Sequence, residues 1–458
     1  MNHTKIASKT QADVHVFDKI DDFFNRFNVS TMLHRCGVRK RHGYSVRSLI
    51  KPIFSLPFFG KNFFRGIVIN EEASFGKDAA YDLLKGTRSN WRCFLLTLGA
   101  RLYRFFNRLT SDERESVLII DDSTYDRSRS KKVELLSRVR DHTTGRFIKG
   151  FRMLTLCWSD GISCLPLDFA LLSSTDATKR CCEATKILDK RCCAYKRREE
   201  ATIKSTVHLA DMMVKRVLAA GINARYVLMD SWFGMPAIIV SVSQHLPVIC
   251  MVKKTSKVLY WFEGRRCNLM TIYRHLKKRR GRAKILASVI VTLKDEHKAK
   301  LVFVRDRRKK DWLALLSTDI HLPDEDVVRI YGKRWDIEVF FKMAKQHLKL
   351  AKEIQCRDYD ALIAHTTIVF MRYMFLAYQC RLETDDRTFG DLFYACCDEL
   401  NDISFVEALY RILTLAANRL REMGAFCEKT AQTFFDTLLE IALSYVNLSK
   451  NKIVINEI

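Results

Sequence analysis

The sequence predicts an α/β fold, in which a mixed β-sheet is flanked by helices and further helical regions lie at both ends of the chain. Two observations predict this class. Between residues 116 and 252, short apolar runs typical of buried strands alternate with longer helical segments. Near both ends of the chain, apolar residues instead recur at helical spacing.

The N-terminal region, residues 1–112, is predicted to be helical and to bind DNA. Its segments VFDKIDDFFNRF, YSVRSLIKPIFSLPFF, AAYDLLKGT and WRCFLLTLGARLYRFFNRL alternate apolar and basic positions at helical spacing. The basic cluster RKRHGYSVR (39–47) lies between the first two helices. We interpret it as a DNA-contacting module, in preference to the solvated side of a helical domain.

The first part of the core, residues 113–255, begins with SVLIIDD, a strand that ends in two aspartates. FRMLTLCWSDGISCLPLDFALL follows as two strands joined by a hairpin at Asp160 and Gly161. A long charged helix then stops at Gly221 and leads into ARYVLMDSWFG, a strand that ends at Asp230. An apolar helix and the strand PVICMV complete an order that implies a mixed sheet with flanking helices.

Residues 256–322 are predicted to form a basic, β-rich insertion. AKILASVIVTL, KAKLVFVRD and DWLALLST are its expected strands, and the clusters KKRRGRAK (277–284) and RDRRKK (305–310) lie among them. The core resumes at 323–378 with the helix YGKRWDIEVFFKMAKQHL. Residues 379–458 return to helices, which we expect to take part in dimerisation.

The chain carries a large excess of positive charge. Its 458 residues include 78 Lys and Arg against 52 Asp and Glu, a formal net charge of +26. Hydrophobic residues make up 48% and charged residues 28%, a balance that argues against global disorder. The charge suits a polyanion, so nucleic acid is the expected partner, although a merely basic protein has the same composition.

The cysteine content and the start of the chain predict a cytoplasmic protein. There are 15 cysteines, and the start MNHTKIASKTQADVHVF has no apolar segment for export, so we expect reduced thiols. The doublets Cys181-Cys182 and Cys192-Cys193 could ligate zinc. Adjacent cysteines chelate one ion poorly, however, so a metal-free loop is the favoured interpretation.

One long uncharged segment is interpreted as part of the core. Residues 231–252 contain no Asp, Glu, Lys or Arg, but Pro236 and Pro247 interrupt them. They fit a buried helix followed by a strand, and no membrane span is predicted.

Three acidic residues occupy positions that suit metal ligation. Asp122 and Asp230 end apolar strands, and Glu338 lies on the late helix. Ligands of open α/β sheets bind beyond the strand ends, so these carboxylates can converge there, and their oxygens suit Mg²⁺ in a two-metal site for displacement at phosphorus. The alternative is that strand-end aspartates only cap helices or form turns. Asp121 competes with Asp122, and we prefer Asp122 because Ser-Thr follows it directly.

The late helix carries a narrow polar stripe on an otherwise apolar surface. At about 100° per residue, the stripe spans about 80° and the rest of the helix should be buried, so the stripe should face a cleft. The alternative is a set of exposed i,i+4 ion pairs worth about 0.2–0.5 kcal/mol each. The members of the stripe are Tyr331, Arg334, Glu338, Lys342 and Lys345.

These residues resemble a known family. The spacing of the tyrosine, arginine, glutamate and last lysine is similar to the Tyr-Arg-Glu-Lys signature of one branch of bacterial insertion-sequence transposases, insertion-sequence family four. IIDDST and VLMDSWFG look like the two aspartate motifs of the DDE superfamily, and DKRCCAYKRREEA is similar to a basic segment common before the second. The resemblance covers roughly residues 115–350 and implies a ribonuclease-H-like core.

The resemblance also implies roles for individual residues. Asp122, Asp230 and Glu338 would be the catalytic triad that binds two Mg²⁺ ions, with Mn²⁺ as the expected substitute. The family pattern of an aspartate followed two residues later by threonine favours Asp122 over Asp121. DNA contacts would come from Tyr331, Arg334, Lys342, Lys345 and Trp312. The tryptophan would stack on a base turned out of the duplex, and the alternative for it is burial under the helix.

The implied reaction is phosphoryl transfer on DNA in the bacterial cytoplasm, at the nucleoid. Water attacks the phosphodiester at the transposon end, and the freed 3′-hydroxyl attacks DNA again, first forming a hairpin and later joining target DNA. The implied partners are the inverted-repeat ends, target DNA and a second copy of the chain in a synaptic dimer.

Two other functions remain open on the sequence alone. One is a domesticated or inactive descendant that binds DNA in a sequence-specific manner without catalysis. The other is a related ribonuclease-H-like nuclease, such as a junction resolvase, which cuts DNA but never joins a 3′ end to a target.

Overall fold

The structure is a computed structural model. The described residues are 16–40, 42–69, 74–109, 114–141, 144–281, 283–306 and 311–382. The predicted dimerisation region therefore lies outside the described residues from 383 onward, and each of the three basic clusters named above is described only in part.

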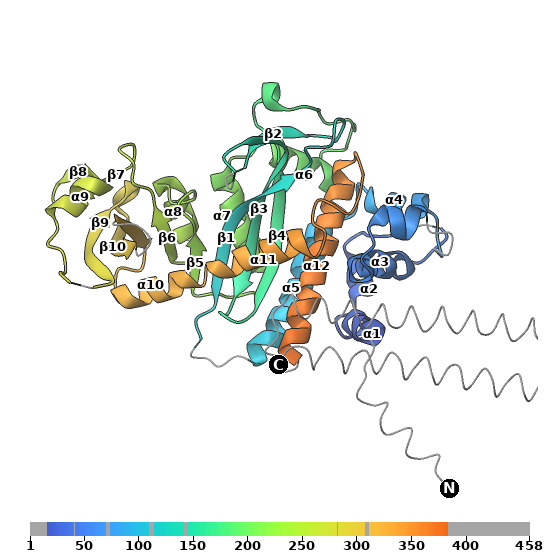
Figure 1. The fold of residues 1–458 in the computed structure, drawn as a ribbon, viewed down its shortest axis with the longest axis horizontal. Helices are drawn as coiled ribbons and strands as arrows, with labels where there is room; N and C mark the ends of the chain where they lie inside the picture. The colour runs from blue at the N-terminus through green and yellow to red at the C-terminus, as the bar shows by residue number, and fades with distance from the viewer. Residues whose placement is uncertain are drawn as a thin grey trace, which may run out of the picture.

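The described strands form one mixed sheet of eleven strands (Figure 1), in the order β2-β3-β1-β5-β6-β11-β10-β9-β7-β8, with β4 paired to β3. Helices flank this sheet, so the predicted α/β class is confirmed, and the architecture is consistent with a ribonuclease-H-like fold. The strands are β1 (Val117–Asp126), β2 (Ser137–Arg140), β3 (Phe147–Ser159), β4 (Cys164–Leu172), β5 (Tyr226–Met229), β6 (Val248–Val252), β7 (Leu259–Phe262), β8 (Arg265–Asn268), β9 (Ile285–Thr292), β10 (Lys298–Asp306) and β11 (Asp311–Ser317).

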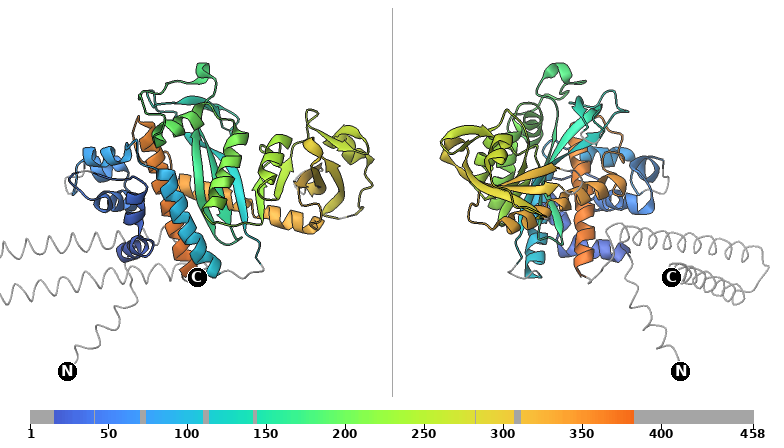
Figure 2. Two further views of the ribbon diagram at one scale, coloured as in Figure 1. Left: turned by 180° about the vertical axis from the view of Figure 1, so that it is seen from behind. Right: turned by 60° about the vertical axis from the view of Figure 1, so that its left-hand side comes forward.

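The helices cover the sheet and build the N-terminal region. Figure 2 shows the N-terminal helices and the strands β7–β10 at opposite ends of the molecule. The helices are α1 (Val16–Arg26), α2 (Val29–Arg35), α3 (Val46–Ser55), α4 (Lys77–Leu84), α5 (Trp91–Arg108), α6 (Cys193–Thr202), α7 (Thr206–Ala219), α8 (Pro236–Ser243), α9 (Leu269–His275), α10 (Asp324–Gly332), α11 (Trp335–Gln346) and α12 (Tyr359–Leu382), with short helical turns at Leu56–Phe59, Phe64–Val68, Ala177–Lys179 and Lys294–Glu296.

The centre of the sheet is formed by β1 and its two neighbours. β1 pairs antiparallel with β3 and parallel with β5, which in turn pairs parallel with β6. The run Val117–Ile120 is fully buried, as expected for a strand covered on both faces. β1 does not end at Asp122, as the sequence suggested, but continues to Asp126, because β3 offers backbone partners along this whole length.

Two segments predicted as single helices are each broken in two. The charged stretch before Gly221 forms α6 and α7, because the hydroxyl of Ser205 accepts a hydrogen bond from the backbone N–H of His208 and caps a new helix. The late helix is divided between α10 and α11. The backbone N–H groups of Lys333 and Arg334 bond to carbonyls three residues back, at 3.0 Å each, which tightens the chain at this junction.

The strands after residue 256 extend the same sheet. β11 pairs antiparallel with β6, with Ala314 opposite Val252, and β10 and β9 follow outward. The core and the segment inserted between β6 and α10 therefore share one continuous hydrogen-bonded ladder.

The long helix α12 lies beside α5 and forms the centre of the helical layer (Figures 1 and 2). Among the described helices, α12 alone is long and apolar enough to cross a membrane, but its apolar window is entirely buried within the fold, as in the core helix of a folded domain. The N-terminal helices pack on it through aromatic rings, with the Phe23 and Phe375 ring centroids 5.5 Å apart.

A buried ionic cluster ties α12 to the N-terminal helices. Both guanidinium ends of Arg372 bond to the carboxylate of Glu353, at 2.7 and 2.8 Å, and Arg372 also donates to the carbonyls of Ile53 and Phe54. His365 lies 2.6 Å from the same carboxylate, and all three side chains are fully buried. The pKa of Glu353 is lowered because Arg372 and His365 outweigh the effect of burial, which alone would raise it.

We expect Arg372→Met to destabilise the protein strongly. The variant leaves Glu353 as an uncompensated buried charge and frees three buried carbonyls, those of Ile53, Phe54 and Leu348, a loss of about 3–5 kcal/mol in the free energy of unfolding. Urea denaturation measures it. Arg191→Met, which removes an exposed pair with Asp189, is the matched control and should leave the free energy of unfolding almost unchanged. Equal losses in both variants would contradict this assignment.

Candidate active site

The register of two parallel strands brings two aspartates together. Ile120 of β1 pairs with Met229 of β5, so the next residues, Asp121 and Asp230, are neighbours at the end of the parallel ladder. Paired residues of adjacent strands point to the same face of a sheet. The carboxylates of Asp121 and Asp230 therefore lie side by side at a carboxyl-end edge, where ligands of α/β sheets bind.

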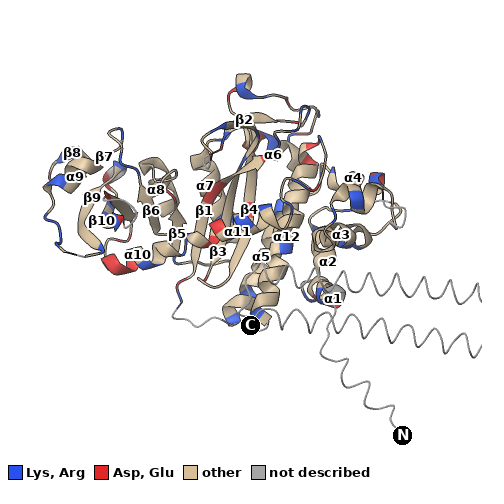
Figure 3. Ribbon diagram, viewed as in Figure 1, with Lys and Arg blue, Asp and Glu red and all other residues tan. Residues whose placement is uncertain are grey.

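Arg334 connects this pair to Glu338. The guanidinium of Arg334, at the junction before α11, lies 3.2 Å from the carboxylate of Asp121 and donates a short hydrogen bond to Glu338. Figure 3 shows the acidic positions of β1 and α11 near each other in the middle of the molecule. One arginine therefore bridges a strand carboxylate and a helix carboxylate.

The electrostatics of Asp121 are unusual. Burial and the neighbouring charge of Asp230 raise the pKa of Asp121 to about 7, while Arg334 acts in the opposite direction. The carboxylate of Asp230 accepts hydrogen bonds from the backbone N–H groups of Trp232 and Phe233, which fixes the turn after β5. Two close carboxylates in a buried site need more positive charge than one arginine supplies.

Asp122 makes a different set of contacts from Asp121. Successive side chains of a strand point to opposite faces, so Asp122 faces away from Asp121. Its carboxylate forms an ion pair with Arg152 at 3.0 Å, and Arg152 donates to the hydroxyl of Thr206 at the start of α7. The choice of Asp122 as a catalytic residue therefore stays a prediction, and it is Asp121 that contacts Arg334 and adjoins Asp230.

The remaining residues of the polar stripe lie along α10 and α11. The hydroxyl of Tyr331 is buried without a hydrogen-bond partner among the described residues, and burial raises its pKa. Lys342 is exposed. Lys345 is half-buried, and burial lowers the pKa of its ammonium group even though Asp141 and Asp126 lie close enough to oppose the shift.

Trp312 is packed inside the inserted segment. Its ring is only 8% exposed, stacks on Tyr273 with centroids 4.4 Å apart, and also contacts Phe303. The ammonium of Lys254 lies 4.0 Å from the ring centroid. This is the buried arrangement given above as the alternative, and it leaves no ring face open for a base.

The sequence reasoning missed an exposed tryptophan beside Asp230. Trp232 follows the aspartate by two residues and is 42% exposed. The ammonium of Lys253 lies 4.3 Å from its ring centroid, and the guanidinium of Arg152 lies 5.8 Å from it. The motif VLMDSWFG places this tryptophan beside Phe233, which is fully buried, so the sequence alone did not show which of the two rings is exposed.

The donor set fits a divalent cation, but it is not assembled as a ready metal centre. No three His, Cys, Asp or Glu side chains in the described part of the chain are close enough to hold an ion. Asp121 and Asp230 are already neighbours. The pKa of Asp121 is raised because the positive charge of Arg334 does not fully offset its burial and the charge of Asp230. The guanidinium of Arg334 occupies the space between Asp121 and Glu338. The residues therefore fit hard oxygen ligation, on condition that Arg334 withdraws.

The cysteine doublets join the loop before α6 to other segments of the chain, and the backbone N–H groups of Cys181 and Cys182 both donate to the carbonyl of Leu136. The sulfur of Cys192 accepts from the backbone N–H of Tyr195 and caps α6, and the thiol of Cys182 donates to the carbonyl of Lys131. These contacts order the loop before α6.

Comparison with known protein families gives one match. A family model described as "DDE superfamily endonuclease" matches residues 66–313, more than half of the 458-residue chain. The matched stretch contains Asp121 and Asp230 and ends before Glu338. A comparison with curated proteins found no match.

We expect the stability of the metal-free protein to depend on Asp121 and pH. The folded pKa of about 7 exceeds the usual 3.8, so between these values the folded protein holds a proton that the unfolded chain has lost, and the free energy of unfolding falls as pH rises. Asp121→Asn should therefore be more stable than the parent at pH 8, by on the order of 1–4 kcal/mol, and similar at pH 4.

Urea denaturation in EDTA at the two pH values measures this difference. Asp82→Asn, at an exposed carboxylate, is the control and should change little at either pH. If the difference in the free energy of unfolding between the parent and Asp121→Asn is the same at both pH values, the pKa of Asp121 is not raised.

Proposed function

The chain belongs to the DDE superfamily of endonucleases, and on that basis we propose that it is a DNA transposase of an insertion sequence. Nucleases of this superfamily act on DNA and generally use divalent metal ions. The observation that supports the proposal is the side-by-side placement of Asp121 and Asp230, with Arg334 bridging to Glu338. The proposed reaction is cleavage at the transposon ends followed by strand transfer to target DNA.

We assign the metal-binding role to Asp121, Asp230 and Glu338. Asp121 replaces the Asp122 of the sequence-based prediction, because its carboxylate faces the other two. Two Mg²⁺ ions, with Mn²⁺ as a substitute, suit these oxygen donors, and when bound they would activate the attacking oxygen and stabilise the leaving oxygen. Asp122 instead orients Arg152 at the neighbouring Trp232.

The chemistry is an in-line displacement at phosphorus. The oxygen of water bonds to the scissile phosphorus as the bond from phosphorus to the 3′ oxygen breaks, and the 3′ oxygen leaves as a hydroxyl after gaining a proton. The oxygen of that hydroxyl then bonds to the phosphorus of a second phosphodiester, either in the opposite strand to close a hairpin or in target DNA. The bond from that phosphorus to its own 3′ oxygen breaks, and the displaced 3′ oxygen leaves as a hydroxyl with the proton of the attacking group. The protein's part is to position the phosphates and neutralise their charge.

Arg334 has two alternative partners in this scheme. In the free protein its guanidinium neutralises Asp121 and Glu338. Divalent cations held by these carboxylates would supply the positive charge that Arg334 supplies in the free protein, and the planar donors of its guanidinium would then suit a phosphate. The buried hydroxyl of Tyr331, whose ring centroid lies 5.9 Å from the guanidinium carbon, can donate to the same phosphate. Lys342 and Lys345 extend the cationic line along α11.

Two ends must be cut in concert, so the active form is proposed to be a synaptic dimer on the inverted repeats. A supercoiled plasmid that carries the reading frame with its flanking DNA is the suitable substrate. Metal-dependent excision and joining would support the transposase. Cleavage without joining would instead indicate a resolvase-like nuclease, and tight binding without cleavage would indicate a non-catalytic DNA-binding descendant.

We expect single substitutions to distinguish the roles of the adjacent residues Asp121 and Asp122. Asp121→Asn, Asp230→Asn and Glu338→Gln should each slow plasmid cleavage by about a hundredfold or more, since loss of metal-based charge stabilisation costs several kcal/mol. Asp122→Asn should retain a larger fraction of the activity. Mn²⁺ binding, followed by calorimetry, should weaken in the first three variants and persist in Asp122→Asn. The reverse pattern would show that Asp122, and not Asp121, is the metal ligand.

A further inference from the structure

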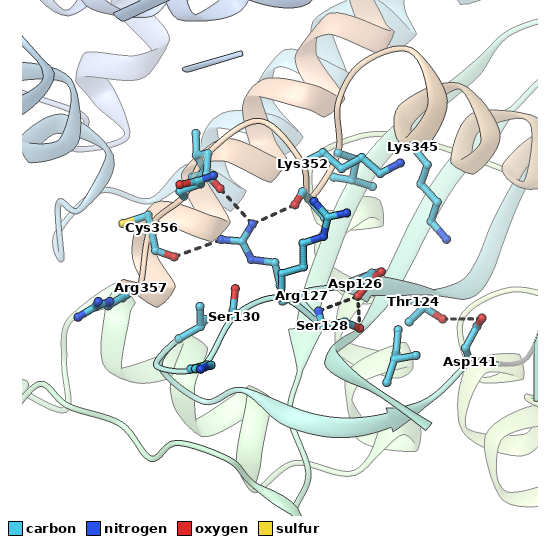
Figure 4. Close-up of a pocket in the computed structure, with 18 of the residues that line it drawn as sticks. Thr124, Asp126, Arg127, Ser128, Ser130, Asp141, Lys345, Lys352, Cys356 and Arg357 are labelled. Carbon is cyan, nitrogen blue, oxygen red and sulfur yellow. Dashed lines mark hydrogen bonds between the residues drawn. The ribbon is translucent and has the colours of Figure 1, made fainter. Parts of the chain in front are cut away.

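A basic cleft of about 1370 Å³ lies next to the proposed active site. One wall is the end of β1 and the loop that follows it, from Thr124 to Val133. Asp141, Thr144, Arg146 and Ile148, beside and on β3, and the connection between α11 and α12 form the other walls (Figure 4). Lys345, a residue of the polar stripe on α11, opens into this cleft and links it to the site of Glu338.

The cleft has a strong excess of positive charge. Eight of its lining side chains are Lys or Arg, and two are Asp. Within the described part of the chain, six of the eight are exposed and form no ion pair with a carboxylate, in contrast to the many paired arginines of the core. The six are Arg129, Lys131, Lys132, Arg146, Lys352 and Arg357.

The two aspartates of the cleft are engaged in holding its walls. Asp126 accepts from both the backbone N–H and the hydroxyl of Ser128, at 2.8 and 2.6 Å. Asp141 accepts from the hydroxyls of Thr124 and Thr144, at 3.2 and 2.7 Å. These bonds order the loops that carry the lysines and arginines. The two aspartates offset only a small part of the positive charge of the cleft.

A buried arginine holds the opposite wall in place. Arg127 is 8% exposed, and its guanidinium donates to the carbonyls of Ala351, Ile354 and Cys356 at 2.9, 3.0 and 3.2 Å (Figure 4). The carbonyl of Arg357 accepts a further bond from the backbone N–H of Glu134. The connection that carries Lys352 and Arg357 is therefore fixed to the sheet, so its cations are held in place before any ligand binds.

The position of the cleft matches a path for DNA away from the cut. Glu338 and Lys345 are separated by about two turns of α11, about 10 Å at 1.5 Å per residue. Phosphates of one B-DNA strand are spaced about 3.4 Å apart along the axis, so Lys345 lies about three phosphates from the active site. Lys345 belongs both to the polar stripe that carries Glu338 and to the wall of the cleft, so DNA bound at Glu338 can reach the cleft along α11.

We propose that this cleft binds the sugar-phosphate backbone of duplex DNA beside the cleavage position, without reading its bases. The place of the cleft in the reaction rests on the proposed transposase function, whereas its affinity for DNA rests on its own charge and geometry. Lysines and arginines on fixed walls suit phosphates at any sequence.

Salt-dependent DNA binding tests the proposal. The double variants Lys131→Ala/Lys132→Ala and Lys352→Ala/Arg357→Ala remove two exposed charges from opposite walls. Lys294→Ala/Lys298→Ala removes two exposed charges from the distant insertion and is the matched control. The probe is a fluorescently labelled random-sequence DNA duplex, and anisotropy is recorded over a range of salt concentrations with the full-length protein. Circular dichroism verifies that each variant is folded.

Each cleft variant should bind the duplex more weakly. The slope of log affinity against log salt should fall by about 0.9 for every phosphate that the variant no longer neutralises, or about 1.8 for two. The control should bind like the parent. Parental affinity and slope in both cleft variants would overturn the proposal. A second result would also overturn it: cleft variants that bind the duplex as well as the parent does but bind poly-glutamate more weakly. The ligand of the cleft would then be an acidic polypeptide.

The plasmid assay separates this proposal from the proposed function. If the parent cleaves the plasmid and the cleft variants bind DNA normally, the cleft proposal fails and the transposase stands. If the cleft variants lose DNA affinity and the parent never cleaves under any metal, the cleft proposal stands and the transposase fails.

Discussion

The arrangement of this protein's site depends on one electrostatic constraint: two carboxylates are forced together in a poorly hydrated place. The parallel pairing of β1 with β5 ends at Ile120 and Met229, and it places the following residues, Asp121 and Asp230, next to each other. Such a pair is stable only with a cation nearby or a proton between its members. Arg334 supplies the cation in the free protein, and its position next to Glu338 connects the strand pair to α11.

The arginines and lysines of the chain divide into two sets with different roles. One set is buried and structural, as with Arg372 on Glu353, Arg198 on Glu134 and Asp360, and Arg127 on three carbonyls of the connection before α12. These bonds tie the helices to the sheet. The other set is exposed, and in the cleft beside α11 it is unpaired within the described residues. The net charge of +26 therefore becomes available to a polyanion only through the second set.

Much of this arrangement could be predicted from sequence, because burial leaves a local pattern. The apolar runs before Asp121 and Asp230 predicted the central strands, and the turn at Asp160 and Gly161 is present. The choice between Asp121 and Asp122 could not be made, because it depends on the register with a strand about a hundred residues away. The division of the late helix at Lys333 and the stacking of Trp312 on Tyr273 also arise from tertiary contacts that leave no local signal.

The proposed reaction requires Asp121, Asp230 and Glu338 to hold divalent cations together once Arg334 withdraws. A crystal structure of the protein with Mn²⁺ and a DNA end, in which anomalous scattering locates the manganese, measures this without an intermediate assumption. We expect manganese between the carboxylates of Asp121 and Asp230, with the guanidinium of Arg334 turned toward a phosphate. Manganese ligated by Asp122, or Arg334 still bridging Asp121 and Glu338 in a crystal that cleaves its DNA, would refute this assignment.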